Sequence, residues 1–285
     1  MSNPQGDLDS LYEVLARYSL LQRRFSKHAD GNGLELRKRL LPPSGDGPAD
    51  NAAGLDRWLQ RQAPLPANAR VLDLGCGFGA SLFRWVEATG SSGVGVTRSR
   101  VQATRAAKES VRRKLGARCT FLVQDFATPL AEQFDTVLAI ESLAHASDLP
   151  AVLRNVHHAL RPGGHFLWLD DGTTKTTSDD PNIVALSHHW HSPSLQAIAM
   201  RRVALENAGL LLLNEIDLTS QVVSRPMQVL ARHQRRLQRI RRFVPIAMVR
   251  HLADAFLGGI ALEQLYASGV ACYRVTVAQR PVVIP

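Results

Sequence analysis

The sequence predicts an α/β fold built on one seven-stranded, mostly parallel sheet with helices on both faces. From residue 70 onward, short β-branched apolar runs alternate with helical segments at the spacing of βαβ units. A glycine-rich turn, DLGCGFG at 73–79, follows the first of these runs. Such a turn lets backbone N–H groups approach a ligand closely, so the expected core is Rossmann-like.

Seven strands are expected between residue 70 and the end of the chain. They are RVLDL (70–74), GVGVT (93–97), CTFLVQD (119–125), FDTVLAIES (134–142), HFLWLD (165–170), LLLLNEID (210–217) and CYRVTVAQ (272–279). Helical stretches separate the first six, which should therefore run parallel and be buried on both faces. We expect an N-terminal helical segment (1–65), a ligand-binding core (66–219), a helical lid insertion (220–270) and the final strand of the core (271–285).

Composition limits the class of protein. A chain of 285 residues with 45% hydrophobic content can build one sizeable domain with an accessory subdomain, or two small domains. No apolar run reaches the roughly 18 residues of a membrane span and no secretory leader is recognisable, so a cytoplasmic protein is expected. The three widely spaced cysteines fit a reduced compartment and free thiols. The net charge of +9 suits an anionic partner, although Arg-rich chains often carry such a charge without one.

The glycine turn by itself leaves two classes of nucleotide cofactor open. Gly75, Gly77 and Ala80 satisfy a relaxed dinucleotide fingerprint, which would suit a nicotinamide or flavin enzyme. Asp73 stands two residues before the first glycine, and position 97 holds Thr where such enzymes place a ribose-binding acid. Both features count against a dinucleotide.

Three motifs in order, VLDLGCGFG, FDTVLAIESLAHA and LRPGG, resemble those of class I S-adenosylmethionine (SAM)-dependent methyltransferases over roughly residues 60–220. Thr97, Ser99 and Gln102 match the Thr-x-Ser-x-x-Gln of a subset that includes sterol-type, tocopherol-type and cyclopropane-synthase enzymes. The resemblance implies that neutral side chains bind the ribose of SAM.

The resemblance also implies a set of cofactor-binding residues. Asp73 would reach the amino group of the methionine moiety, and Asp125 with Phe126 would hold the adenine; a purely structural role is open for Asp73, and a helix N-cap for Asp125. The full set is Asp73, Gly75, Cys76, Gly77, Thr97, Arg98, Gln102, Asp125, Phe126 and Ile140. Cys76 is expected to serve only as a small side chain in the turn.

Candidate catalytic residues are Glu141, His145 and Asp170. In similar sterol C-methyltransferases a Glu at the first position stabilises cationic character or accepts a proton, whereas in O-methyltransferases a His acts as base for a hydroxyl. Structural roles for Glu141 and His145 stay open as well. Ala144 replaces a Glu that cyclopropane synthases use, which makes cyclopropanation doubtful.

The stretch SHHWHSPS does not predict a metal site. Ser192 and Pro193 look like the start of a helix, so His188, His189 and His191 are expected in a loop, contributing with Trp190 to the acceptor pocket.

The segment QVLARHQRRLQRIRRFV (228–244) predicts an amphipathic, basic helix. Its apolar positions are Leu230, Leu237, Ile240 and Val244, and its basic ones Arg232, Arg235, Arg236, Arg239 and Arg242. A solvated lid, contact with an anionic membrane surface and a clamp on an anionic substrate are the three open explanations. Nucleic acid is not favoured, because the arginines are not interleaved with aromatic residues.

The expected function is SAM-dependent methyl transfer to a small, largely apolar metabolite of isoprenoid, lipid-like or polyketide-like type, at carbon or oxygen. The acceptor could also be anionic. The alternative is a SAM-binding protein without transfer: a cyclase, regulator or interaction subunit. The sequence leaves the oligomeric state open, a homodimer included.

Overall fold

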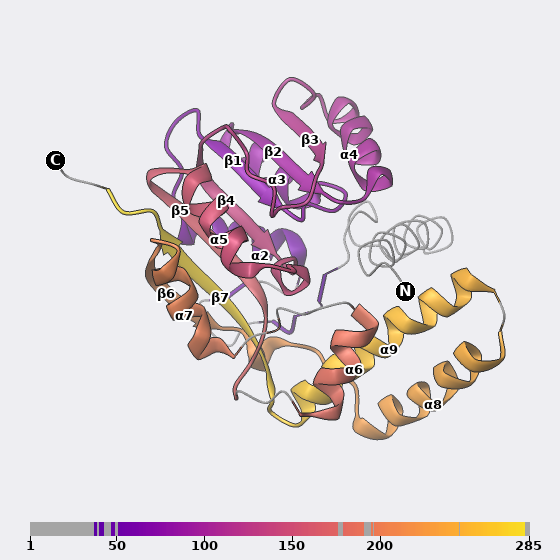
Figure 1. Ribbon diagram of the computed structural model, residues 1–285. Coiled ribbons are helices and arrows are strands. Elements are labelled where there is room, and N and C mark those ends of the chain that lie inside the picture. Colours follow the sequence, from indigo (N-terminus) through magenta and orange to yellow (C-terminus); the bar gives the residue numbers. More distant parts are fainter. Residues whose placement is uncertain are drawn as a thin grey trace.

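The computed structural model of the chain describes residues 37–38, 40–42, 47–48, 51–175, 179–190, 195, 197–244 and 246–282 (Figure 1). Most of the expected N-terminal helical segment, together with His191, Ser192 and Pro193, lies outside these residues. The boundaries of the four expected units stay predictions.

A single seven-stranded sheet forms the centre of the described chain. Its strands are β1 (Arg70–Leu74), β2 (Ser92–Thr97), β3 (Cys119–Val123), β4 (Phe134–Ile140), β5 (Leu160–Thr173), β6 (Leu211–Asp217) and β7 (Ala271–Gln279). They lie in the order β3-β2-β1-β4-β5-β7-β6, and β7 runs antiparallel to both of its neighbours. The strand order reverses between β1 and β4, which is where sheets of this kind bind ligands.

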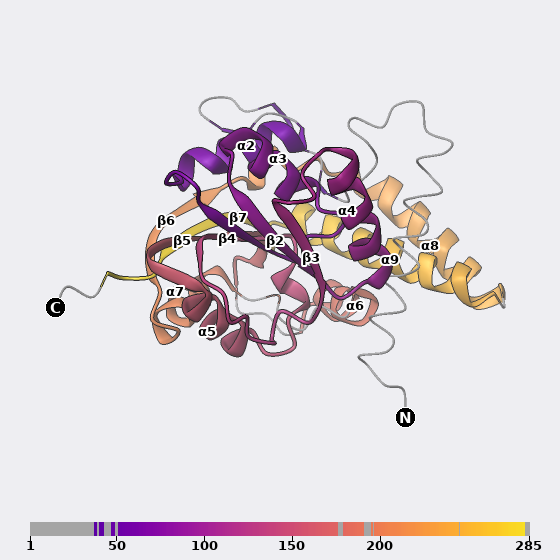
Figure 2. The same ribbon diagram turned by 90° about the horizontal axis from the view of Figure 1, so that it is seen from above.

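Helices cover both faces of the sheet (Figure 2). One face carries α2 (Ala52–Gln62), α3 (Ala80–Thr89) and α4 (Arg100–Arg112), and the other carries α5 (Leu149–Ala159) and α7 (Ile198–Asn207). Because side chains alternate along a strand, Val71 and Leu138 pack on the first face while Leu72 and Val137 pack on the second. The predicted fold class is therefore confirmed.

The carboxyl ends of three strands differ from the sequence prediction, and β5 also begins earlier, at Leu160. β4 stops at Ile140 because Glu141 adopts a left-handed backbone conformation, with φ +51°, that a strand cannot contain. β3 stops at Val123, because Asp125 forms a turn by accepting a hydrogen bond from the N–H of Ala127. β5 extends to Thr173 because β7 pairs with it as far as Ala271.

Three further helices lie beyond the carboxyl ends of the parallel strands. They are α6 (Pro181–Trp190), α8 (Met227–Phe243) and α9 (Ala247–Ala267), and the last two form a hairpin that extends away from the sheet in both views (Figures 1 and 2). α6 packs on α9, where the indole N–H of Trp190 donates to the carbonyl of Ala255 at 2.7 Å. None of the described helices has the length and apolar content that crossing a bilayer requires.

The contact between α6 and α9 depends on one glycine. A Cβ added at Gly258 would lie 2.2 Å from Cδ1 of Trp190, whereas one at the adjacent Gly259 would lie 3.6 Å from the same ring. We expect Gly258→Ala to lower the free energy of unfolding by about 1–2 kcal/mol, because overpacking outweighs the gain in helix propensity. Gly259→Ala is the matched control and should raise it by up to ~1 kcal/mol. Urea unfolding measures both, and equal effects of the two substitutions would contradict this packing.

Candidate active site

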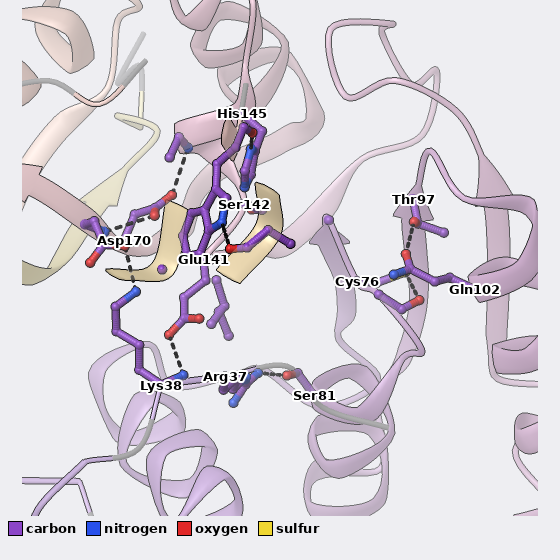
Figure 3. Close-up of a pocket in the computed structure, with 18 of the residues that line it drawn as sticks. Arg37, Lys38, Cys76, Ser81, Thr97, Gln102, Glu141, Ser142, His145 and Asp170 are labelled. Carbon is purple, nitrogen blue, oxygen red and sulfur yellow. Dashed lines mark hydrogen bonds and ion pairs between the residues drawn. The ribbon is translucent and has the colours of Figure 1, made fainter. Parts of the chain in front are cut away.

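All but one of the predicted site residues line a single cavity of about 570 Å³ at the carboxyl ends of β1, β2, β4 and β5. The exception is Asp125, which is not part of the lining. Figure 3 shows Thr97 and Gln102 on one side of this cavity, and Glu141, Asp170, His145 and Lys38 on the other. The structure thus brings the predicted residues together, and their individual roles stay predictions.

The glycine turn after β1 has one side packed and one side open. Gly75 and Gly77 have φ angles of +83° and +53°, which disfavour other residues. A Cβ at Gly75 would lie 2.4 Å from Cβ of Ser142, so this glycine allows the turn to approach the end of β4. A Cβ at Gly77 would meet no atom within 4 Å, although the residue lines the cavity. The open side of the turn therefore leaves room for a ligand.

The end of β2 carries a hydrogen-bonded trio that explains the Thr-x-Ser-x-x-Gln spacing. The Thr97 hydroxyl donates to the side-chain oxygen of Gln102 at 2.6 Å and accepts from the backbone N–H of Ser99 at 3.2 Å. Ser99 is the N-cap of α4, its hydroxyl accepting from the backbone N–H of Gln102. Both Thr97 and Gln102 are buried but line the cavity, so their orientation is fixed before any ligand binds.

Asp73 and Cys76 lie at the base of this side of the cavity. Burial raises the pKa of Asp73 to about 7, an effect that the positive charge of Arg37 partly opposes. No described residue makes a hydrogen bond to its carboxylate that would hold the charged form. Burial also raises the pKa of the Cys76 thiol well above its ordinary value, so Cys76 is not a thiolate nucleophile.

Beyond the end of β2, Arg98 and Phe126 both line the cavity. Asp125 turns its carboxylate toward the N–H of Ala127, at 2.8 Å, and toward the guanidinium of Arg98, at 3.6 Å. It therefore shapes the loop that carries Phe126. Ile140, at the end of β4, completes the apolar part of this wall.

The opposite side of the cavity carries three carboxylates. Glu141 accepts a hydrogen bond from the hydroxyl of Tyr273 at 2.6 Å and one from the backbone N–H of Lys38 at 3.2 Å. Asp171 pairs with the ammonium of Lys38 at 2.6 Å and also accepts from the hydroxyl of Tyr266. Burial opposes the charge of Lys38, but Asp171 and Glu141 outweigh it and raise the lysine pKa above its ordinary value.

Asp170 is bonded to the backbone. Its carboxylate accepts from the N–H of Ala144 at 3.1 Å and from that of Asp171 at 2.9 Å. Burial, reinforced by the neighbouring Asp171, raises the pKa of Asp170 to about 6. This carboxylate consequently fixes the turn that carries His145.

His145 lies in the short 3₁₀ turn η1 (Leu143–His145). Its Nδ1 is 3.1 Å from the carbonyl oxygen of Trp190. Because a carbonyl can only accept, this contact places a proton on Nδ1 and, in the neutral ring, leaves Nε2 as the basic nitrogen.

Apolar residues of α6 and α9, here called the lid helices, and of the segment between α6 and α7 complete the cavity. They are Leu186, Trp190, Leu195, Ala255, Phe256 and Gly259. This part of the wall offers few polar groups to water.

The prediction for the histidine stretch is partly wrong. His188 and His189 lie in the last turn of α6 and not in a loop, because the helix continues to Trp190, whose indole is anchored on α9. His189 pairs with Asp254 at 2.9 Å. Among the described residues no cluster of His, Cys, Asp and Glu could hold a metal ion. Trp190 lines the cavity, whereas His188 and His189 are not part of its lining.

Sequence reasoning missed Lys38, Tyr266 and Tyr273. Lys38 belongs to a stretch without a motif. Tyr266 lies in the helical insertion and Tyr273 in the last strand, both far from any recognised pattern. The only available signal was a polar-tipped aromatic residue, Tyr273, in the otherwise apolar alternation of the last strand.

Comparison with known proteins finds similarity to methyltransferases in both sequence and fold. The methyltransferase domain family matches residues 49–221. Sterol 24-C-methyltransferase from Aspergillus fumigatus is 28% identical over 173 residues, which is 58% of this chain and 46% of that protein. The chain thus spans about half the length of this relative.

Two solved structures share the fold over nearly the whole chain. The (4+2)-cyclase SpnF has a TM-score of 0.71 at 19% identity, covering 96% of this chain and 95% of its own. Geranyl diphosphate C-methyltransferase from Streptomyces coelicolor, in complex with Mg²⁺, geranyl diphosphate and S-adenosyl-L-homocysteine, has a TM-score of 0.65 at 16% identity, covering 95% and 97%.

The raised pKa of Asp73 has a consequence for stability. Between pH 4 and about 7 the folded chain retains a proton that the unfolded chain has released, so stability falls as pH rises through this range. The wild-type free energy of unfolding should fall by up to about 4 kcal/mol over this range, and the substitution Asp73→Asn, which removes the titrating group, should abolish that fall. Urea unfolding at several pH values measures it, with the exposed Glu206→Gln as control. Parallel pH profiles for wild type and Asp73→Asn would contradict the assignment.

Proposed function

This chain belongs to the methyltransferase domain family, and on that premise we propose that it transfers the methyl group of SAM to a small, largely apolar metabolite. The observation that carries the proposal is the continuous cavity, which joins a nucleotide-type side at the glycine turn to an acidic and apolar side beneath the lid helices. The sterol 24-C-methyltransferase relative supports an apolar acceptor.

The residues on the glycine-turn side fit SAM. Gly77 leaves open space where a Cβ would otherwise project, and Thr97 with Gln102 presents neutral polar groups suited to ribose hydroxyls. Asp73 would hold the amino group of the methionine moiety, whose positive charge favours the ionised carboxylate. Phe126 and Ile140 provide apolar contact for the adenine. Because the Asp125 carboxylate is already engaged, we assign it to shaping this loop.

When bound, SAM supplies an electrophilic methyl group on a positively charged sulfur. The protein then contributes mainly by aligning the reactants in a dry cavity. Holding two reactants in the correct orientation lowers the activation free energy by about 7–11 kcal/mol. Leu186, Trp190 and Phe256 exclude water and select an apolar acceptor.

The charges in the cavity favour a neutral acceptor over a diphosphate. Each cationic side chain of the lining has a carboxylate partner: Arg37 pairs with Asp56, Lys38 with Asp171, Arg98 with Asp125 and Arg225 with Glu263. The described residues also provide no cluster of His, Cys, Asp and Glu for a divalent metal, and the geranyl diphosphate enzyme was crystallised with Mg²⁺. A diphosphate would have to displace these pairs.

Glu141 favours transfer to carbon. When an alkene or aromatic carbon attacks the methyl group, positive charge develops on the acceptor, and a nearby carboxylate stabilises it and accepts the proton. Tyr273 and the backbone N–H of Lys38 hold this carboxylate at the cavity wall. Transfer to a hydroxyl would instead rely on the imidazole of His145.

The direct test is incubation with methyl-labelled SAM and a metabolite extract, followed by mass spectrometry of labelled products. A labelled, largely apolar product is expected. The fold alone does not establish transfer, since a cyclase shares it; SAM binding without any labelled product would refute the proposal.

Gly77→Val should weaken cofactor binding. The new side chain would occupy the open side of the turn, so affinity for S-adenosyl-L-homocysteine should fall by roughly 100-fold, the equivalent of about 3 kcal/mol of overpacking. Gly90→Val is the matched control, because Gly90 also has a positive φ, +71°, with no atom within 4 Å of an added Cβ, but lies outside the cavity lining. Calorimetry measures both. Similar losses for the two variants would mean that backbone strain, and not the cofactor site, is responsible.

Turnover of two variants distinguishes carbon from oxygen as the acceptor atom. Carbon transfer predicts that Glu141→Gln lowers kcat by about 100-fold or more, the usual scale for a general base, while His145→Ala has a smaller effect. The acceptor found in the labelling experiment is used at saturating SAM, and unchanged calorimetric affinity for S-adenosyl-L-homocysteine serves as control. The reverse order of effects would indicate oxygen transfer.

A further inference from the structure

One face of α8 carries an uncompensated row of arginines. The helix contains six arginines and no acidic residue. Five of them recur at helical spacing on one side and are exposed: Arg232, Arg235, Arg236, Arg239 and Arg242. Among the described residues none of these five forms an ion pair. Arg241, which lies on a different side, pairs with Asp254 at 2.6 Å.

The opposite face of α8 is already in use. Leu230 is fully buried, and Gln234 accepts a hydrogen bond at 3.1 Å from Gln264 of α9. α8 is therefore held against α9 by this face, and the arginine face points away from α9. In both ribbon views the hairpin extends beyond the sheet (Figures 1 and 2). The arginine row consequently lies on an accessible outer surface of the fold.

Apolar side chains lie at the end of this row. Phe243 is 71% exposed and Ile246, just before α9, is 56% exposed. Phe243 follows Arg239 by one helical turn, and the guanidinium of Arg242 lies 5.4 Å from its ring centre. An exposed phenylalanine beside arginines suits the boundary between lipid headgroups and acyl chains, where each type of side chain finds its preferred surroundings.

We propose that the arginine face of α8, with Phe243 and Ile246 at its end, docks the protein on the surface of an anionic lipid bilayer. The arginines meet the headgroup phosphates, and the two apolar side chains enter the interface. A polyanion such as RNA would satisfy the arginines equally well but would leave Phe243 and Ile246 exposed. The inference does not depend on the proposed methyl transfer, because it concerns a surface outside the cavity.

Co-sedimentation with vesicles tests the proposal on the full chain. Wild-type protein should bind vesicles of phosphatidylcholine mixed with phosphatidylglycerol, and should not bind phosphatidylcholine alone. Changing the five arginines to Gln should weaken partitioning by ~100-fold or more, since each arginine near an anionic surface is worth roughly fivefold. Raising salt from about 0.1 M to about 0.5 M should act in the same direction.

Two control variants distinguish an effect of the arginine face of α8 from an effect of the overall net charge. A variant that loses five exposed cations elsewhere, Arg57, Arg105, Lys108, Arg154 and Arg202, all to Gln, should bind like wild type. Changing the five arginines of α8 to Lys should retain most binding, because the charge remains.

The apolar anchor is tested by Phe243→Ser with Ile246→Ser. This variant keeps the net charge and should lose about tenfold in partitioning, because less apolar surface enters the interface. It leaves the arginines unchanged, so it remains informative if the variant with all five arginines changed to Gln does not fold. Equal binding to both kinds of vesicle, or equal loss in the distant-cation variant, would overturn the proposal. Binding to a short RNA but not to anionic vesicles would also overturn it, in favour of nucleic acid.

Discussion

The antiparallel pairing of β7 with β5 determines where the Glu141 side of the cavity is built. β5 ends at Thr173 on the edge where β1 and β4 also end, and β7 begins opposite it at Ala271. The chain between β6 and β7 must therefore be accommodated at that edge, so α9 reaches the cavity and not a face of the sheet. The same pairing places Tyr273 within 2.6 Å of Glu141. A parallel last strand would begin at the other edge and leave the cavity uncovered.

The buried acidic groups near the cavity are accommodated in two different ways. Asp171 is compensated by the ammonium of Lys38, and Asp56 by the guanidinium of Arg37, so that neither charge is isolated. Asp73, which lacks such a partner, has a pKa raised to about 7 and takes up a proton near neutrality. Arg37 and Lys38, which precede the core in the sequence, supply the cations of these two pairs. The polar wall of the cavity is consequently assembled from both ends of the described chain.

The sequence was sufficient to predict the strands, whose patterns are local, and to place the residues of the glycine-turn side in one cavity. Thr97 and Gln102 are five residues apart, and the turn that holds them follows directly from a strand end. The side that holds Glu141 differs: Lys38 meets Glu141 across 103 residues, and Tyr273 meets it across 132. No periodicity or spacing encodes such pairs, since they arise only when the strand order and the antiparallel return of β7 are known. The left-handed backbone of Glu141, which ends β4, was equally invisible in the apolar run that predicted the strand.

The wall formed by α6 and α9 has a consequence for how this protein could diverge. Leu186, Phe256 and Gly259 line the cavity, yet they take no part in the ladder of strand hydrogen bonds. A substitution at one of these positions reshapes this part of the cavity while the register of the sheet, and with it the glycine turn, stays unchanged. The shape of the cavity can therefore change by single substitutions on two helix faces, whereas a change on the glycine-turn side involves residues at several strand ends.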